Sequence, residues 1–283
     1  MTVSLGNWLH AAIRLLSVSS ERPMAEAQWL AAYGLERGRA WVAAHPEVIL
    51  DGEQQRRLDD LLQRRVAGEP LPYILGEWEF YGLRLRVSPA VLIPRPETEL
   101  LVEDGLAWLA ENPNRRRAAD VGTGSGCIAA ALATRVQDLR FVAVDFSRAA
   151  LRVAGENFAT LGLTGRVNLV QGDLLSALVG PFDLVCANLP YIPWSTLTEL
   201  AVAKTEPLLA LDGGEDGLRL IDALLRDAKR WMSPGGLMLL EIEQGQGDAA
   251  VALAKQLLGE QVEVKLVRDL AGLAREVWIR WRN

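Results

Sequence analysis

The chain has 283 residues, half of them apolar and 23% charged, which is typical of a globular protein with one large domain or two smaller ones. The formal net charge of −6 gives no sign of a polyanion-binding protein, and no uncharged stretch reaches the ~18 apolar residues that a membrane span requires. Two cysteines are too few for a disulfide framework and two histidines too few for a histidine-rich metal site, so we expect a cytoplasmic protein without a metal.

Residues 1–75 have helical patterns and no strand pattern. The clearest helix begins after Asp51, which forms a capping-box pair with Gln54, and ends at Gly68. Its apolar face is made by Leu58, Leu61, Leu62 and Val66. Another helix begins at Pro23, because proline suits the first turn. The sequence therefore predicts a small helical domain over residues 1–75.

From residue 76 onward, apolar residues recur at every second position. Trp78 and Phe80 alternate with glutamates, and beyond Tyr81-Gly82 three apolar residues alternate with arginines. This alternation around a glycine predicts a β-hairpin over residues 76–93. The hairpin is expected to link the helical domain to the rest of the chain, residues 94–283.

Residues 94–283 alternate helices with short apolar strands, beginning with a helix that Pro96 opens. Strands are expected at residues 118–121, 141–144, 167–170, 184–187, 237–242, 262–267 and 276–281. Helices separate most of the first five, which predicts a mostly parallel sheet covered on both faces. The last two have only a short connection and predict an antiparallel pair at the edge. The expected fold class is α/β and Rossmann-like.

A glycine-rich loop follows the first strand of this predicted sheet. It consists of Gly122, Thr123, Gly124, Ser125 and Gly126, and Asp120 stands two positions before it. Glycines let the backbone turn tightly and approach a ligand at the carboxyl ends of the strands. The G-x-G-x-G spacing differs from the dinucleotide fingerprint, and no Lys-Ser/Thr pair of a phosphate-binding loop follows. The loop resembles the first motif of class I S-adenosylmethionine-dependent methyltransferases.

Two further aspartates follow the next strands. Asp145 ends the second strand, where a carboxylate can bind both ribose hydroxyls of a nucleoside. Asp173 follows the third strand and could accept from an adenine amino group, with Leu174 packed on the ring. Each aspartate alone would be a helix cap or a turn residue. Three of them at successive strand ends, in register with a glycine loop, favour S-adenosylmethionine as the cofactor.

Asn188-Leu189-Pro190-Tyr191 follows the fourth strand and should border the same cleft, with Asn188 also beside the cofactor. In methyltransferases an Asn-x-Pro-Tyr-like sequence here accompanies methylation of planar nitrogens, in glutamine amides or base amines. The Asn188 side-chain oxygen and the Leu189 carbonyl could accept the two N–H groups of such a nitrogen. Pro190 would stiffen the loop, and Tyr191 would pack against the acceptor. The alternative is a polar turn without chemistry.

Several segments are similar to the bacterial release-factor glutamine N5-methyltransferases, the PrmC or HemK family. They lie at residues 70–82, 92–99, 120–128, 206–218 and 240–246. The resemblance implies that the helical domain docks a peptide chain release factor. It also implies that the acceptor is the glutamine of the factor's Gly-Gly-Gln loop. We expect a monomer.

Two residues depart from the family pattern, which has proline where this chain has Leu189 and commonly glycine where it has Glu243. Glu243 has no explanation in the sequence. Asn-Leu-Pro-Tyr also resembles the motif of ribosomal RNA adenine dimethyltransferases, which keeps an N6-adenine-type methyltransferase of RNA or DNA as the alternative. Residues 115–117 are all arginine and could contact phosphate or form a solvated loop. A non-catalytic cofactor-binding adaptor is the third hypothesis.

Overall fold

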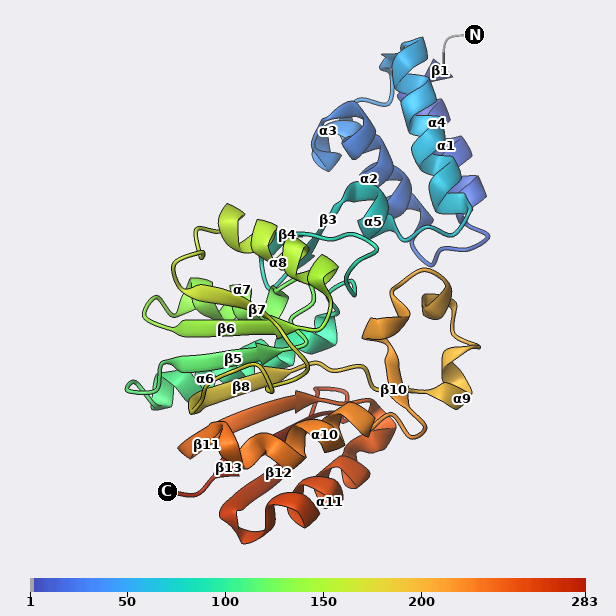
Figure 1. Ribbon diagram of the computed structural model, residues 1–283. Helices are drawn as coiled ribbons and strands as arrows, with labels where there is room; N and C mark the ends of the chain where they lie inside the picture. The colour runs from blue at the N-terminus through green and yellow to red at the C-terminus, as the bar shows by residue number, and fades with distance from the viewer. Residues whose placement is uncertain (1–2) are drawn as a thin grey trace. The chain divides into compact units, whose positions relative to one another are not determined.

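The computed structural model describes residues 3–283 and divides into two compact units. The first unit ends at Gly76, and the second extends from Glu77 to Asn283. Figure 1 shows helices alone in most of the first unit and a helix-covered sheet in the second. The expected hairpin therefore belongs to the second unit.

The first unit is built from helices that pack through small and apolar residues. Their bounds are α1 (Leu5–Leu16), α2 (Pro23–Leu35), α3 (Arg39–Ala44), α4 (Gly52–Val66) and α5 (Leu71–Leu75). The capping box at α4 is confirmed, because Asp51 accepts from the Gln54 N–H while the Gln54 side chain accepts from the Asp51 N–H. Val66, expected on the buried face, is exposed in the last turn of α4.

A short antiparallel pair in the first unit contradicts the expectation of no strand before residue 76. It joins β1 (Val3–Ser4) to β2 (Ile49–Leu50). Two residues per strand are too few to show a period of two, so the sequence pattern had no means of indicating this pair.

The hairpin consists of β3 (Glu77–Phe80) and β4 (Leu83–Arg86), paired as expected. Tyr81 and Gly82 both have positive φ, at 50° and 73°, which is the conformation of a two-residue hairpin turn. Asn157 of α8 (Arg148–Thr160) fastens the hairpin to the rest of the second unit: its side chain accepts from the Arg86 N–H and donates to the carbonyls of Arg86 and Ser125. The hairpin is therefore linked to the glycine loop through Asn157.

Within residues 3–283 the main sheet has seven strands in the order β12-β13-β11-β8-β5-β6-β7. The parallel strands are β5 (Arg117–Val121), β6 (Arg140–Asp145), β7 (Val167–Gln171), β8 (Phe182–Ala187) and β11 (Met232–Glu241). The edge strands β12 (Val262–Arg268) and β13 (Ala274–Trp281) are antiparallel to each other, and β13 is antiparallel to β11. The expected mostly parallel sheet with an antiparallel edge pair is confirmed.

Helices cover both faces of the sheet, as its continuous apolar strands require. One face packs on α6 (Glu99–Glu111), α7 (Cys127–Arg135) and α8 (Arg148–Thr160). The other face packs on α10 (Arg219–Asp227) and α11 (Gly247–Leu258). The helix that Pro96 opens begins as a 3₁₀ turn, η1 (Pro96–Thr98), before it continues as α6.

The segment between β8 and α10 adds elements that the sequence did not predict. It contains a short parallel pair, β9 (Ile192–Pro193) and β10 (Asp212–Gly214). Between them lie α9 (Trp194–Leu197), η2 (Ala201–Lys204) and η3 (Leu208–Ala210). The segment begins with the Asn-Leu-Pro-Tyr motif directly after β8, so its short elements form part of the surroundings of that motif.

Candidate active site

The register of the parallel strands brings the predicted site residues to one edge of the sheet. Val121, the last residue of β5, lies opposite Val144 of β6 and Ala187 of β8. The loop from Gly122, the β6 end at Asp145 and the motif from Asn188 therefore all begin at one level. Such an edge is where α/β sheets bind ligands.

Asp120 holds the glycine loop from inside the protein. Its buried Oδ2 accepts from the Thr123 hydroxyl at 2.6 Å and from the Ala129 N–H at 3.3 Å. Burial raises the pKa of Asp120 to about 6. Thr123 and Ser125 are also buried, so their side chains build the loop from within. The three glycines all have positive φ.

Gly126 shows why a side chain is excluded from the end of this loop. Its φ is 80°, and an added Cβ would lie 2.6 Å from Cζ of Phe158 on α8. Real Cβ atoms do not approach that closely, so alanine would push the loop away from the helix. The close packing of Gly126 against α8 therefore sets how far the loop stands from the cleft.

Asp145 is joined to the glycine loop by hydrogen bonds. Its Oδ2 accepts from the Gly124 N–H at 2.8 Å, and its Oδ1 accepts from the Ser147 N–H at 2.8 Å. Partial burial raises the pKa of this carboxyl. Each carboxylate oxygen keeps a second lone pair, so Asp145 can still accept hydrogen bonds from a bound diol. Phe146, directly after it, exposes 63% of its surface and offers an aromatic face beside the same site.

Asp173 and Leu174 lie beyond the end of β7, at the same edge. Asp173 is exposed, and its carbonyl accepts from the N–H and the hydroxyl of Ser176. Leu174 has φ of 49°, a conformation that a bulky residue rarely adopts. Such strain persists only where the surrounding structure imposes it, and it collects at ligand sites.

In the Asn-Leu-Pro-Tyr motif, Asn188 and Leu189 make different contacts. The Asn188 Nδ2 donates to the Thr98 hydroxyl at 3.0 Å, and its Oδ1 has no hydrogen bond to any other part of residues 3–283. Leu189 is buried, and its Cδ2 would lie 3.1 Å from a Cβ added at Gly122. Leucine in place of the family's usual proline therefore packs the motif against the glycine loop.

The Tyr191 backbone is held by groups from three later segments. Its carbonyl accepts from the Gln246 Nε2 at 2.8 Å. A Cβ added at Gly213 would lie 2.7 Å from the Tyr191 Cα, and one at Gly217 would collide with the Tyr191 carbonyl oxygen. The Tyr191 hydroxyl lies 3.4 Å from Oε1 of Glu241, and burial raises the pKa of the phenol.

Glu243 has a structural explanation that the sequence lacked. Its side chain accepts from the Gly245 N–H at 2.8 Å, and its own N–H donates to the Gln246 Oε1 at 3.1 Å. This capping box begins the 3₁₀ turn η5 (Gln244–Gln246). With Oε1 so occupied, the Gln246 amide directs its Nε2 to the carbonyls of Tyr191 and Asp216. The Glu243 side chain thus caps the turn, while its backbone N–H orients the Gln246 amide that binds the Asn-Leu-Pro-Tyr motif.

A pocket of about 140 Å³ lies beside the motif. It is lined by Leu92, Arg95, Asn188, Tyr191, Ile192, Val202, Ala210 and Leu211. Glu206 holds the segment that contains the pocket residue Arg95. Its Oε1 lies 2.5 Å from the Arg95 Nη2, and its Oε2 accepts from the Ile93 N–H at 3.0 Å. The pocket is small and mostly apolar, with an asparagine side chain and a tyrosine ring at its edge. These dimensions suit a single side chain or a base.

Sequence reasoning missed Thr98, Glu241 and Gln246, which all contact the motif or a residue that does. Glu241 could have been found by the rule that identified Asp145 and Asn188, because it is a polar residue at the carboxyl end of a core strand. Thr98 and Gln246 carry no such local signal. Thr98 contacts Asn188, 90 residues later in the chain, and Gln246 contacts Tyr191, 55 residues earlier.

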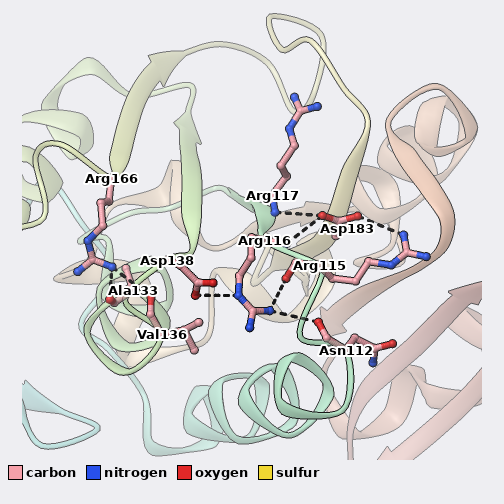
Figure 2. Close-up of polar contacts among 9 residues, drawn as sticks. All are labelled: Asn112, Arg115, Arg116, Arg117, Ala133, Val136, Asp138, Arg166 and Asp183. Atoms are coloured by element: carbon pink, nitrogen blue, oxygen red, sulfur yellow. Dashed lines mark hydrogen bonds and ion pairs between the residues drawn. The ribbon is translucent and has the colours of Figure 1, made fainter.

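The arginine run at residues 115–117 has a structural role within the second unit. Figure 2 shows Asp183 between the three arginines: its carboxylate pairs with the Arg115 guanidinium and accepts from the N–H groups of Arg116 and Arg117. The Arg116 guanidinium pairs with Asp138 at 2.7 Å. The run ends at Arg117, the first residue of β5, and so lies at the opposite end of that strand from the glycine loop. Its position therefore gives the RNA alternative no support.

No group of three or more metal-ligating side chains occurs in the described part of the chain, residues 3–283. Over the same residues, no helix combines the length and apolar character needed to cross a bilayer. Cys127 and Cys186 are both buried as free thiols. Burial raises the pKa of Cys127 to about 12 and that of Cys186 well above the usual value, so neither is a reactive thiolate.

Comparison with known proteins gives matches over both units. The PrmC N-terminal domain model matches residues 7–76, and the methyltransferase small domain model matches residues 97–205. The release factor glutamine methyltransferase of Moorella thermoacetica is 42% identical over 276 residues, covering 96% of this chain and 97% of the relative. The Escherichia coli protein of the same name is 39% identical over 245 residues, with 86% and 87% covered.

Solved structures show the same fold at low sequence identity. A methyltransferase from Pyrococcus furiosus has a TM-score of 0.53 at 18% identity, covering 81% of this chain and 98% of its own. The Thermus thermophilus 16S rRNA N2 G1207 methyltransferase has a TM-score of 0.52 at 17% identity, covering 73% and 50%. These similarities bear on the fold alone.

Proposed function

This chain belongs to the release factor glutamine methyltransferase family, and we propose that it methylates the side-chain amide nitrogen of the glutamine in the Gly-Gly-Gln loop of peptide chain release factors. The single observation that carries the proposal is the orientation of Asn188. Its amide nitrogen is tied to Thr98, which leaves its oxygen as a hydrogen-bond acceptor beside the pocket.

The residues at the sheet edge fit S-adenosylmethionine, the methyl donor of this family. The glycine loop leaves open space at Gly124, where an added Cβ would meet only the Gly122 carbonyl oxygen, 4.0 Å away. Asp145 retains lone pairs for two ribose hydroxyls. Asp173, Leu174 and Phe146 would surround the adenine ring. When bound, S-adenosylmethionine supplies an electrophilic methyl group on its sulfonium. The backbone of Thr123 and Ser125 would border the same ligand.

The acceptor chemistry explains why an asparagine and a carbonyl are needed. An amide nitrogen is a weak nucleophile because its lone pair is delocalised into the carbonyl. The Asn188 Oδ1 and the Leu189 carbonyl would accept both N–H groups and direct the nitrogen at the methyl group. The Tyr191 ring would pack on the planar amide, and Pro190 would restrict the loop. Positioning would supply most of the rate. As the N–CH3 bond forms, the S–CH3 bond would break and leave a neutral thioether, and the very acidic methylated nitrogen would then release a proton to water.

Residues 1–75 would dock the release factor while residues 94–283 carry out the transfer, joined through the hairpin of residues 76–93. The protein would act in the cytoplasm as a monomer. The match of residues 7–76 to the PrmC N-terminal domain supports the docking role, because the Moorella thermoacetica relative with the release-factor name aligns over 96% of this chain and so over most of this unit.

Transfer of a labelled methyl group tests the function directly. Release factor, ribosomal RNA and DNA are each incubated with the full chain and tritiated S-adenosylmethionine. We expect label in the release factor alone, and no label after its loop glutamine is replaced. Label that persists on that mutant factor would exclude the proposed acceptor. Label in RNA or DNA instead would select the N6-adenine alternative, and no transfer to any of them would favour an adaptor.

Replacing Asp145 with alanine should weaken cofactor binding. Loss of hydrogen bonds from a charged carboxylate costs about 1.5–3 kcal/mol, which corresponds to a rise in Kd of roughly tenfold to a hundredfold. Titration calorimetry with S-adenosylmethionine measures this change. Asp227→Ala is the matched control, because Asp227 is exposed at the end of α10. An unchanged Kd for the Asp145 variant would rule out ribose binding by this residue.

A further inference from the structure

Arg95 is held in an extended backbone conformation between two prolines, Pro94 and Pro96. A residue that precedes proline is restricted to extended conformations, and Arg95 has φ of −100° and ψ of 144°. Its carbonyl accepts from the Thr98 N–H at 3.1 Å, which fixes the chain where η1 begins. Its side chain is 33% exposed and lines the pocket beside the Asn-Leu-Pro-Tyr motif. Arg95 therefore reaches the pocket from a rigid piece of backbone.

Glu206 binds the guanidinium of Arg95 from another wall of the same pocket. It lies between η2 and η3, and one residue of each, Val202 and Ala210, lines the pocket. The Glu206 side chain is only 4% exposed. Its Oε1 accepts from the Arg95 Nη2, and its Oε2 accepts from the Ile93 N–H. A buried carboxylate with a partner on each oxygen has a fixed orientation, so it also fixes the position of the Arg95 Nη2.

The Arg95 guanidinium keeps N–H groups that no residue of the described chain accepts. Arginine has five N–H donors on three nitrogens. Within residues 3–283 the Arg95 Nη2 bonds to Glu206, whereas Nε and Nη1 have no acceptor. The other polar side chains of the pocket are engaged, because the Asn188 Nδ2 donates to a threonine hydroxyl and the Tyr191 hydroxyl donates to a glutamate. Of the described pocket side chains, Arg95 therefore has the most donors left for a ligand.

We propose that Arg95 binds the carbonyl oxygen of the acceptor amide, and that Glu206 is the positioning residue that holds the guanidinium there. A primary amide presents two N–H groups and one carbonyl oxygen. Asn188 and Leu189 would accept the two N–H groups, and the oxygen then needs a donor, since burying an unpaired polar group is costly. This inference rests on the proposed function, because it assigns the other end of the same acceptor amide.

The hydrogen bond from Arg95 would favour substrate binding and not the transfer step. Amide resonance places negative charge on the carbonyl oxygen before the reaction. As the nitrogen gives its lone pair to the methyl group, this resonance is lost and the oxygen becomes a weaker acceptor. An interaction that is no stronger in the transition state lowers KM without raising kcat. Removal of Arg95 should therefore change KM, whereas removal of Asn188 should change kcat.

Arg95→Met tests the donors, because methionine fills the apolar wall and has no N–H group in its side chain. With the full chain, S-adenosylmethionine and release factor, we expect the KM for the factor to rise about tenfold to a hundredfold, as for a lost hydrogen bond from a charged group, without a fall in kcat. Arg95→Lys keeps a cation with N–H donors and should recover part of this loss. Arg226→Met is the matched control, since Arg226 pairs with Asp222 on the exposed side of α10 and should leave KM unchanged.

Two further variants separate the role of Glu206 from folding. Arg95→Met leaves a buried charge at Glu206 without its cation, which destabilises the fold. The double variant Arg95→Met/Glu206→Gln removes that charge too, so its free energy of unfolding should recover toward wild type while its KM stays high. Glu206→Gln alone has one side-chain oxygen for two donors, so the guanidinium loses its fixed position and KM should rise with Arg95 present. A wild-type KM in Glu206→Gln would remove Glu206 from the proposal.

The outcomes distinguish this inference from the proposed function. An unchanged KM in Arg95→Met, a fall in kcat without a change in KM, or a weaker Kd for S-adenosylmethionine by calorimetry would each overturn the assignment of Arg95 to the acceptor. A KM that returns to wild type in the double variant would overturn it as well. A release factor that the wild-type protein leaves unlabelled would refute the proposed function, whereas a labelled factor with an unchanged KM in Arg95→Met refutes the inference alone.

Discussion

Replacing Asn188 with alanine is expected to lower kcat by about 10² to 10³, because removing one preorganised hydrogen-bonding group from an acceptor site has that effect. The Asn188 Nδ2 donates to the Thr98 hydroxyl at 3.0 Å, and this hydrogen bond fixes the orientation of the Asn188 Oδ1. The loss corresponds to about 2.7–4 kcal/mol of transition-state stabilisation. The measurement is single-turnover methyl transfer to a release factor at saturating S-adenosylmethionine.

Two controls make the Asn188 result specific. Asn168→Ala removes an exposed asparagine of β7 and should leave kcat unchanged. Calorimetry should show that Asn188→Ala still binds S-adenosylmethionine, since the loop and Asp145 remain. Full activity in Asn188→Ala would contradict a role in acceptor binding. A protein that lost transfer but kept its biological function would be an adaptor.

Gly217→Ala is expected to lower kcat by displacing the Asn-Leu-Pro-Tyr motif, although Gly217 lies outside that motif. Gly217 has φ of 79°, and an added Cβ would collide with the Tyr191 carbonyl oxygen and with the Gln246 Nε2. Alanine should therefore break the bond from Gln246 and displace Tyr191. Displacing a reacting geometry by about 1 Å can cost about a hundredfold in rate. We expect kcat to fall by that order, measured with release factor as above.

Gly272→Ala provides a closely matched control for this substitution. Gly272 also has φ of 79°, but an added Cβ there meets no atom within 4 Å. Alanine in this backbone conformation costs roughly 1–2 kcal/mol of folding stability at either position. Denaturant unfolding should show that loss in Gly272→Ala and a larger one in Gly217→Ala, where the collision adds to it, and only Gly217→Ala should lose activity. Similar activities in the two variants would mean that the contact of Gly217 with Tyr191 does not position the motif.

Much of the fold follows from local patterns in the chain. The capping box at Asp51, the hairpin turn at Tyr81-Gly82 and the seven strands of the main sheet each depend on residues close in sequence. Apolar runs of strand length between amphipathic helices admit few arrangements other than a parallel sheet with helices on both faces. The short pairs β1–β2 and β9–β10 escaped prediction because two or three residues carry no period.

The arginine run illustrates the limit of composition. Three consecutive arginines give the same local signal whether they face solvent, phosphate or the protein. Asp183, more than 60 residues away, decides the outcome by accepting from two of their backbone N–H groups and pairing with the Arg115 guanidinium. The net charge of −6 described the whole chain and said nothing about this position. A count of charges does not reveal which of them are already paired.

The sequence by itself determined the class of fold, and it predicted correctly that the glycine loop, Asp145 and Asn188 lie at one edge of the sheet. It could do so because parallel strands place their carboxyl ends together, so that position along the chain implies position in space. Only the tertiary structure decided which groups hold Asn188 and Tyr191. These groups are Thr98, Gln246 and Gly217, which are distant in sequence and contact Asn188 or Tyr191 because of the way the loops fold. Sequence periodicity does not predict the conformation of a loop, and a hydrogen bond depends on that conformation to within a few tenths of an ångström.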